Sequence, residues 1–333
     1  MMPTVSVIIA TYNYGRYLAD AVESALSQTL GDLEIIVVDD GSTDDTPDVV
    51  RPFLHDRRVQ YHRLDHCGQP AAKNAGIRRA RAPLVAFLDA DDLWLPTKLE
   101  KQVALSKTNS QAGVVYARRL LIDEQGQPLH YDQPALHRGR VVKPMFRDNF
   151  VCFSSALVRR AVFDDVGMFD ESLPLAIDYD LWLRVATKYD FDYVDEPLVL
   201  YRTGHASLSQ RTEERLFIAN RIMQRFLKAH GGASSLPRVV VRRARAETCY
   251  HIALARRGRS RWRALPWYLL ALTWWPTFGP AWHGLASLPL PEAVRRCLRM
   301  LLGRPADWAV RSPVPSDGLS SSARRLEVCP PRG

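Results

Sequence analysis

The chain has 333 residues, 47% of them hydrophobic, which is enough for one large core or a core with an appendage and indicates a globular protein. Its formal net charge of +9 is unevenly spread, because residues 1–210 hold 23 Lys and Arg against 29 Asp and Glu, whereas residues 211–333 hold 22 against 7. This excludes a uniformly basic protein, and the two parts are expected to have different partners.

The cysteines, the N-terminus and the apolar segments lead us to expect a protein that is not disulfide-rich, exported or membrane-spanning. The five cysteines are scattered and form neither a CxxC pair nor a disulfide framework, which favours a reducing cytoplasm. The N-terminus lacks the pattern of an export signal. The most apolar region, residues 264–290, is interrupted by prolines, whereas a spanning helix needs about 20 apolar residues. We expect no simple transmembrane helix and a cytoplasmic location.

In chain order, short apolar runs alternate with segments of helical period, as in a parallel sheet covered on both faces. A helix with an apolar face at Leu18, Ala21 and Val22 follows the first strand. Gly41 permits a tight turn after the second strand, and "CGQPAAKNAGI" is predicted as a glycine-marked loop entering a helix. The strands predicted in this part are Val5–Ala10, Leu33–Val38, Val59–Leu64 and Pro83–Leu88. Ser42, Asp44 or Asp45 can cap the helix after the second strand.

Further along, Pro96 is predicted to open a helix, and residues 123–140 to form a polar loop. Strands are predicted at 113–122, 152–160 and 192–202, with a helix at 178–189 and helical structure from Thr212 onward. The last stretch, 312–333, has few large apolar residues and is expected to be disordered. The expected organisation is an α/β domain over 1–210, a basic, Trp-rich helical region over 211–311 and a disordered tail.

Polar clusters follow three of the predicted strands. Thr11 to Asn13 follow the first, Asp39 and Asp40 the second, and Asp89, Asp91 and Asp92 the fourth. Ligands bind where parallel strands end, because the loops converge there. Each cluster alone is also explained by turn chemistry, since Asp and Asn favour turns and caps. Their common placement is what predicts a ligand site.

The acidic run "FLDADD" suits Mg²⁺ or Mn²⁺, which commonly take one or two protein carboxylates together with substrate phosphates. Asp89 and Asp91 can both serve only if the strand bends at Ala90 and Asp91, because a straight strand sends them to opposite faces. The alternative is that Asp92 caps the next helix and the other acids are solvated.

Several motifs in order make the chain resemble glycosyltransferase family 2 enzymes of the GT-A fold. They are "SVIIATYNYGRYLADAVESALSQTLGDLEIIVVDDGSTDDT", "GQPAAKNAGI", "FLDADD" and "DYDLWLR", and the resemblance covers roughly residues 4 to 205. It implies an inverting enzyme that uses a nucleotide-diphosphate sugar and a divalent cation. The fold expected is a GT-A type, mostly parallel α/β sheet followed by a basic helical region.

The resemblance also implies roles for individual residues. Relatives usually carry Arg where this chain has Lys73, which keeps the charge but not bidentate phosphate contact. His205 lies where relatives have a His after Tyr-Arg, and would reach the diphosphate or the metal; the alternative is a surface or packing residue, which a lone His in a loop more often is. In the nucleotide site, Thr11 and Tyr12 line the pocket, Asp40 bonds the base (uracil in many relatives), Asp89 contacts ribose or metal, and Asp91 ligates the metal.

The general base implied by the resemblance is Asp178, with Asp180 as the competing candidate. Asp178 is preferred because the family places the base at the helix entrance, whereas Asp180 could face away on the helix surface. The family often has Glu before this Asp, and Ile177 departs from that pattern. Both acids could instead serve only the helix dipole, for about 0.3 to 1 kcal/mol each. The metal and Lys73 would stabilise the leaving diphosphate, while Asp178 would take the acceptor proton.

The basic region combines arginines with tryptophans, a pattern that suits an anionic membrane interface. We expect peripheral docking on the cytoplasmic leaflet near a lipid-linked acceptor. The alternative is that the Trp faces pack on the catalytic domain with Arg in solvent; nucleic acid is not expected.

The function expected is transfer of a sugar, with UDP-sugar as the favoured donor, to a glycan or lipid-linked acceptor in surface polysaccharide, lipopolysaccharide or glycolipid synthesis. The alternative is a degenerate nucleotide-sugar-binding adaptor at the membrane, which Ile177 and Lys73 keep open.

Overall fold

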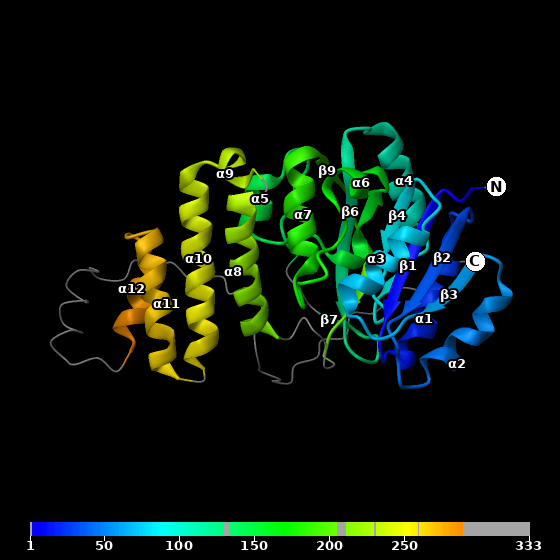
Figure 1. The fold of residues 1–333 in the computed structure, drawn as a ribbon, viewed down its shortest axis with the longest axis horizontal. Helices are drawn as coiled ribbons and strands as arrows, with labels where there is room; N and C mark the ends of the chain where they lie inside the picture. The colour runs from blue at the N-terminus through cyan, green and yellow to red at the C-terminus, as the bar shows by residue number, and fades with distance from the viewer. Residues whose placement is uncertain (1, 130–132, 205–210, 230, 259, 289–333) are drawn as a thin grey trace, which may run out of the picture. The chain divides into compact units, whose positions relative to one another are not determined.

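The computed structural model describes residues 2–129, 133–204, 211–229, 231–258 and 260–288, so the tail predicted to be disordered lies outside the described residues. The strands are β1 Val5–Thr11, β2 Leu33–Asp39, β3 Val59–Arg63, β4 Leu84–Phe87, β5 Leu93–Trp94, β6 Ala112–Ile122, β7 Pro128–Leu129, β8 Leu157–Arg159 and β9 Asp190–Arg202. They form one sheet in the order β3-β2-β1-β4-β8-β6-β9-β5, with β7 paired to β6 (Figure 1).

The sheet is mostly parallel, as predicted. The longer pairings, β1 with β2 and β4, β2 with β3, and β6 with β9, are parallel. Shorter antiparallel pairings join β8 to β4 and β6, and β5 to β9. The α/β fold class predicted from the sequence is therefore confirmed.

Helices cover the sheet and continue beyond it. The helices that accompany the sheet are α1 Gly15–Leu26, α2 Thr46–Val50, η1 Arg51–His55, α3 Gln69–Arg79, α4 Lys98–Thr108, α5 Val142–Arg147, η2 Phe153–Ser155, α6 Ala161–Val166 and α7 Ile177–Lys188. The C-terminal helices are α8 Thr212–Ala229, α9 Gly232–Ser235, α10 Arg238–Arg257, α11 Arg261–Trp274 and α12 Gly279–Ala286.

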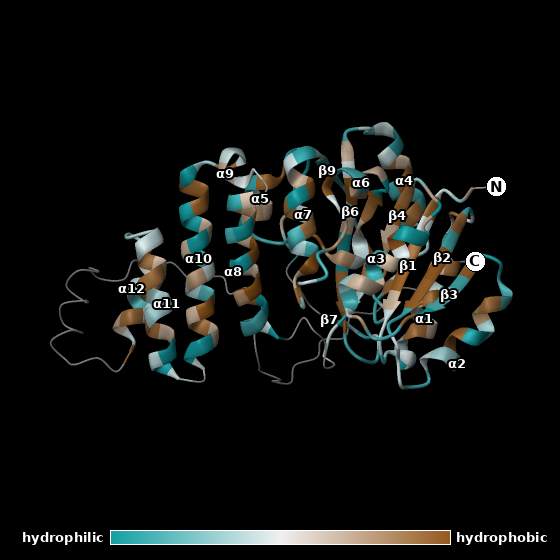
Figure 2. Ribbon diagram, in the orientation of Figure 1, coloured by the Kyte–Doolittle hydropathy of each residue, from teal (hydrophilic) through white to brown (hydrophobic). Residues whose placement is uncertain are grey.

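The central strands are apolar because both of their faces are covered. Along β1, Val7 and Ile9 pack in the cluster that contains the buried face of α1, whereas Ile8 packs in the cluster that contains Ala72 of α3. Figure 2 shows the resulting concentration of hydrophobic residues in β1 and β2. The apolar face predicted for the first helix, including Leu18, is the buried face of α1.

Several predicted boundaries were wrong. Of the strand predicted over 152–160, only Leu157–Arg159 is a strand, because Phe153–Ser155 form the 3-10 helix η2. The glycine-marked segment is a loop only up to Gly68, and α3 begins at Gln69 with a proline in its first turn. The helix predicted to open at Pro96 begins at Lys98, after the unpredicted strand β5.

Helix α8 shares the core of the sheet domain, to which α10 adds Ala244. Ile222 and Phe226 of α8 lie in the same buried cluster as α5 and α7, and the rings of Phe226 and Phe146 are 6.0 Å apart. Arg256 stacks over Phe217 of α8 and Trp267 of α11, which ties α10 to its neighbours. In the part of the chain that the structure describes, none of the helices has the length and hydropathy needed to cross a membrane.

Candidate active site

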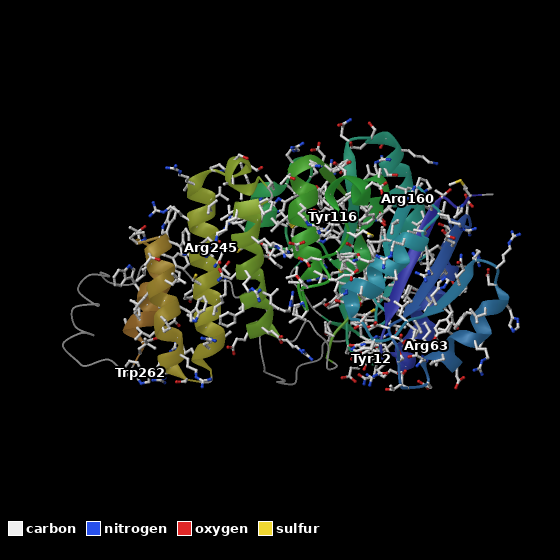
Figure 3. All side chains as sticks on the ribbon, in the orientation of Figure 1. Tyr12, Arg63, Tyr116, Arg160, Arg245 and Trp262 are labelled. Carbon is white, nitrogen blue, oxygen red and sulfur yellow. The ribbon has the colours of Figure 1, made fainter. Side chains whose placement is uncertain are left out.

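The predicted polar clusters lie at one end of the sheet. Thr11 ends β1, Asp39 is its register partner at the end of β2, and Arg63 is in turn the partner of Asp39 at the end of β3. Tyr12 and Arg63 accordingly lie at the same end of the sheet in Figure 3. Parallel pairing therefore brings residues from distant parts of the sequence to a single edge.

Asp40 is held by the loop between β3 and α3. Its Oδ1 accepts a hydrogen bond from the backbone N–H of Cys67 at 2.8 Å, and its Oδ2 accepts one from the N–H of Gly68 at 2.9 Å. The His66 ring nitrogen Nδ1 lies 2.9 Å from Oδ2. The same His66 ring stacks on Tyr12, with centroids 4.1 Å apart. Asp40 and the aromatic pair thus form one connected group.

Local desolvation of the sulfur, together with the hydrogen bond from its Sγ to Asp40, raises the pKa of the Cys67 thiol to about 11. Cys67 is therefore protonated at neutral pH even though its side chain is exposed.

Asp39 and Asn13 hold the loop that follows β2. Asp39 is fully buried and accepts hydrogen bonds from the Ser42 N–H at 2.8 Å and the Tyr61 hydroxyl at 2.5 Å. Asn13 has a φ of 57°, and its side-chain oxygen accepts from the Thr43 N–H at 2.7 Å. These contacts give both residues a loop-holding role.

Two other details of this edge concern Thr11 and the start of α2. The Thr11 hydroxyl is buried without a hydrogen-bond partner among the described residues. Asp44, one of the capping residues expected, accepts from the Thr46 N–H at the start of α2.

The acidic segment after β4 forms a tight turn. β4 ends at Phe87, and the Asp92 N–H donates to the Asp89 carbonyl at 3.1 Å. Asp92 is buried, and its carboxylate accepts from the Ser154 hydroxyl at 2.5 Å and the Arg202 N–H at 3.0 Å. The predicted bend at Ala90 and Asp91 is present. The alternative that Asp92 caps the next helix is wrong, because α4 begins at Lys98.

Lys73 pairs with the first acid of this turn. Its Nζ lies 2.7 Å from Oδ1 of Asp89 and 3.7 Å from the ring centroid of Phe153. The lysine is 3% exposed. Lys73 therefore offsets the charge of Asp89 and is itself shielded from water.

Burial raises the pKa of Asp89 above its ordinary value, Lys73 opposes that shift, and the neighbouring Asp91 and Asp178 carboxylates add to it. Asp178 comes from a different element, so three acids share one electrostatic environment. Tyr14 lies there too: burial, with Asp91 and Asp89, raises its pKa to about 12.

This concentration of carboxylates fits a hard divalent cation. Asp89 and Asp91 offer oxygen ligands, and their mutual repulsion is what a bound cation would relieve. Among the described residues, no group of three or more His, Cys, Asp or Glu side chains could hold a metal ion. The donor set thus suits a cation that completes its coordination with a ligand's phosphates, and does not suit an all-protein cage.

Asp178 and Asp180 lie in the first turn of α7 but have different surroundings. Oδ2 of Asp178 accepts a hydrogen bond from the Asn149 side-chain amide at 2.7 Å, and the residue is half-buried. Asp180 is 3% exposed and is paired with Arg184 at 3.0 Å and Arg225 at 2.5 Å. The expectation that Asp180 could face away on the helix surface is wrong; it forms a buried ion pair.

His205 lies outside the described residues.

Sequence reasoning missed the residues that brace the turn after β4. Arg202, at the end of β9, donates through Nε to the Asp91 carbonyl at 3.0 Å and through Nη1 to the Glu124 carbonyl at 2.8 Å. The sequence signal that could have pointed to Arg202 is a charged residue at the end of a strand with apolar residues. Ser154 had none, because its role depends on η2 lying under the turn.

Two cavities lie apart from these residues. One, of about 340 Å³, is lined by Arg140, Lys143 and Thr187 among others. The other holds about 10 Å³ beside Arg119 and Phe150. None of the predicted site residues lines either cavity, so neither defines the candidate site.

The sequence model of the family "Glycosyl transferase family 2" matches residues 6–167. An uncharacterized glycosyltransferase of Rickettsia typhi is 32% identical over 235 residues, which is 68% of this chain and 72% of the relative. Relatives in Rickettsia felis and Rickettsia bellii are longer, and the chain spans 37% and 27% of their lengths.

Solved structures share the fold at low sequence identity. A crystal structure of S. aureus TarS, residues 1–349, has a TM-score of 0.58 at 18% identity. The match covers 87% of this chain and 81% of the TarS chain. A mannosyltransferase from Pyrobaculum calidifontis, in complex with GDP-Man and Mn²⁺, has a TM-score of 0.58 at 18% identity. The match covers 89% of this chain and 79% of the mannosyltransferase chain. These likenesses concern the fold.

Proposed function

The chain belongs to glycosyl transferase family 2, and on that basis we propose that it is an inverting enzyme acting on a nucleotide-diphosphate sugar, with a UDP-sugar as the donor. The acceptor proposed is a hydroxyl of a glycan or lipid-linked molecule in cell-surface polysaccharide, lipopolysaccharide or glycolipid synthesis. The choice of donor is supported by TarS, which has been crystallised in complex with UDP and with UDP-GlcNAc. The mannosyltransferase complex with GDP-Man supports the wider class of donor.

The observation that carries this proposal is the meeting of acids from separate elements. Asp89 follows β4 and Asp178 opens α7, yet the Asp178 charge contributes to the raised pKa of Asp89. A cation, Lys73, lies in contact with the same group. Such an arrangement can act at both ends of a transfer reaction, where one bond breaks to a diphosphate and another forms to a hydroxyl.

On the donor side, Thr11, Tyr12 and Asp40 hold the nucleoside, with Asp40 bonding the base. Lys73 stabilises the negative charge that grows on the leaving diphosphate by exchanging part of its contact with Asp89 for a phosphate oxygen. A divalent cation, Mn²⁺ or Mg²⁺, held by Asp91 and Asp89 would supply further positive charge to that diphosphate.

On the acceptor side, Asp178 is the general base. Because Asn149 holds Oδ2, the second oxygen is the one that takes the proton from the acceptor hydroxyl. The hydroxyl attacks the anomeric carbon from the face opposite the diphosphate, so the configuration inverts and no covalent sugar intermediate forms. Asp180 does not compete, since two arginines hold it.

The proposal is tested by thermal stabilisation with UDP-GlcNAc, UDP-glucose, UDP-galactose and GDP-mannose, with and without Mn²⁺, followed by assay of nucleoside diphosphate release. Asp178→Asn is expected to lower turnover by at least about 100-fold while leaving the stabilisation by donor unchanged. Asp164→Asn, at an exposed position on α6, is the matched control.

Metal-dependent stabilisation without turnover in the wild type would favour the adaptor alternative instead. Full activity of Asp178→Asn would refute the general-base assignment.

We further propose that the C-terminal helices associate with the inner face of the plasma membrane. Trp262, Leu269 and Leu270 of α11 are 53%, 49% and 37% exposed and lie on one side of the helix. Arg261 and Arg263 flank them, and residues 248–288 contain no Asp or Glu. This combination suits anionic lipid headgroups. The other described tryptophans of this region are at least half-buried, as the packing alternative expects for them.

A further inference from the structure

The proposed base lies near the end of a segment that connects α6 to α7. This base segment, Phe169–Asp180, begins beyond the residues that match the family model, which end at 167. Nine residues of the segment, 169–177, precede Asp178, which is the second residue of α7. The part before Ile177 contains no strand or helix. The position of Asp178 therefore depends on contacts that the segment makes with other elements.

The start of the base segment is tied to the donor side of the site. The Asn74 side chain, next to Lys73 on α3, donates to the Phe169 carbonyl at 2.9 Å and accepts from the Phe169 N–H at 3.0 Å. It also donates to Glu171 at 2.9 Å. One amide thus fixes the backbone at the beginning of the segment.

Arg225 of α8 joins the two ends of the base segment. Its Nη1 is paired with the Asp170 carboxylate, and its Nη2 lies 2.5 Å from Oδ1 of Asp180. The two acids are ten residues apart, and Asp178 lies between them. Asp180 is 3% exposed, whereas the Arg225 side chain is 34% exposed, so the carboxylate end of this ion pair is the shielded one. A planar guanidinium with several fixed donors suits such a double contact.

The backbone just before Asp178 needs this support. Ala176, the N-cap of α7, has a φ of 54°, a left-handed conformation that an alanine adopts only when surrounding contacts impose it. Arg184 of the same helix also pairs with Asp180 and donates to the carbonyls of Gly167 and Met168, just before the base segment. Arg225 adds a contact from a separate helix, and that contact reaches the acids at both ends of the base segment.

We infer that Arg225 is a positioning residue for Asp178: by holding Asp170 and Asp180 together it fixes the base segment, and helix α8 is thereby part of the active site's architecture. The inference rests on the proposed function for the role of Asp178. Arg225 itself touches no reacting atom. Its effect is on the chemical step, and donor binding at the ends of β1 and β2 is left unchanged.

Arg225→Gln tests this inference, with Arg221→Gln as the matched control, since Arg221 is exposed one turn earlier on the same helix. Hydrogen exchange followed by mass spectrometry is expected to show amides of 170–180 exchanging at least about tenfold faster in Arg225→Gln. The amides of α8 and all amides of Arg221→Gln should exchange at wild-type rates. Unchanged protection of 170–180 would overturn the inference whatever the enzyme's substrate is.

Kinetics give the second readout, using the nucleotide sugar that the donor panel identifies. Arg225→Gln is expected to lower kcat at least about tenfold, with the Kd for UDP within twofold of wild type and partial recovery in Arg225→Lys. In an Asp178→Asn background, Arg225→Gln should have no further effect, because the group it positions is gone.

An equal further loss in the Asp178→Asn background would overturn the positioning role. Full activity of Asp178→Asn would instead refute the base assignment, and the exchange measurement would still decide whether Arg225 holds the segment.

Discussion

Nζ of Lys73 lies 2.7 Å from Oδ1 of Asp89, so the cation proposed to meet the donor's diphosphate is already paired with the first acid of the turn after β4. The pair joins α3 to that turn, and the lysine is almost completely buried. The ligand site and the stability of the sheet edge are therefore linked through one contact.

Lys73→Met is expected to lower the free energy of unfolding by about 2 kcal/mol, because it leaves a carboxylate without its partner in a shielded position. The loss stays below the full cost of an isolated buried charge, since the Asp89 side chain is 27% exposed. Urea unfolding measures the change. Adding Asp89→Asn should recover most of it, and a Lys73→Met protein as stable as the wild type would contradict the structural role of the pair.

Lys98 provides a pH-dependent test of the core. Its side chain is fully buried, donates to Gln102 at 2.8 Å and lies over the Trp94 ring. Burial lowers the pKa of Lys98 well below its ordinary 10.5. At pH values between the lowered pKa of the folded chain and the ordinary pKa of the unfolded chain, the unfolded chain holds a proton that the folded chain lacks. The free energy of unfolding then rises with pH, by up to about 1.4 kcal/mol per pH unit.

Lys98→Met should remove that slope and be more stable than the wild type near neutral pH, with the advantage shrinking towards pH 10. Denaturant unfolding of both proteins at several pH values measures the difference. Parallel profiles would mean that Lys98 keeps its proton when folded.

The contact between Cys67 and Asp40 can be measured through thiol chemistry. With a pKa raised to about 11 from 9, the thiol should react with iodoacetamide at pH 8 about 100-fold more slowly than an unperturbed cysteine. Asp40→Asn should speed labelling of the Cys67 peptide several-fold. Asp65→Asn, an exposed acid of the same loop, should not change it. Equal rates in Asp40→Asn and the wild type would show that Asp40 does not hold the thiol.

The membrane proposal predicts that the intact chain floats with vesicles containing about 30% phosphatidylglycerol and not with purely zwitterionic ones. Replacing Trp262 and Leu269 by Ser should reduce the floating fraction at least about fivefold, and raised salt should weaken binding. Leu54→Ser removes a similarly exposed apolar side chain, at 45%, from η1 and serves as the control. Failure of the wild type to float would remove the proposal.

The sheet was predictable because its strands are buried on both faces and so stand out as apolar runs. β1, β2 and β4 fall within a residue or two of their predicted bounds, and the end of β2 carries the expected turn at Gly41, where φ is 78°. By contrast, β5 has only two residues, Leu93 and Trp94, and gives no periodic signal. The 3-10 helix η2 was missed for the same reason.

The surroundings of the site residues were not predictable, because they depend on pairings between distant parts of the chain. Asp180 looked like a surface acid of α7, and its burial follows from Arg225, which arrives from α8. For Asp92 the sequence left a helix cap open as the alternative, and its actual partners Ser154 and Arg202 come from η2 and β9. Periodicity shows which residues are inside, whereas the partner of each buried charge is set by the tertiary fold.

The loop over Asp40 has a consequence for how tightly a nucleotide can bind. Both oxygens of this carboxylate already receive hydrogen bonds, from the Cys67 and Gly68 amides. A base that bonds to Asp40 replaces or shares contacts that the empty protein already makes, so only the difference between the two sets contributes to affinity. For the proposed bond between the base and Asp40, the net gain in affinity is therefore smaller than it would be for a carboxylate without hydrogen-bond partners.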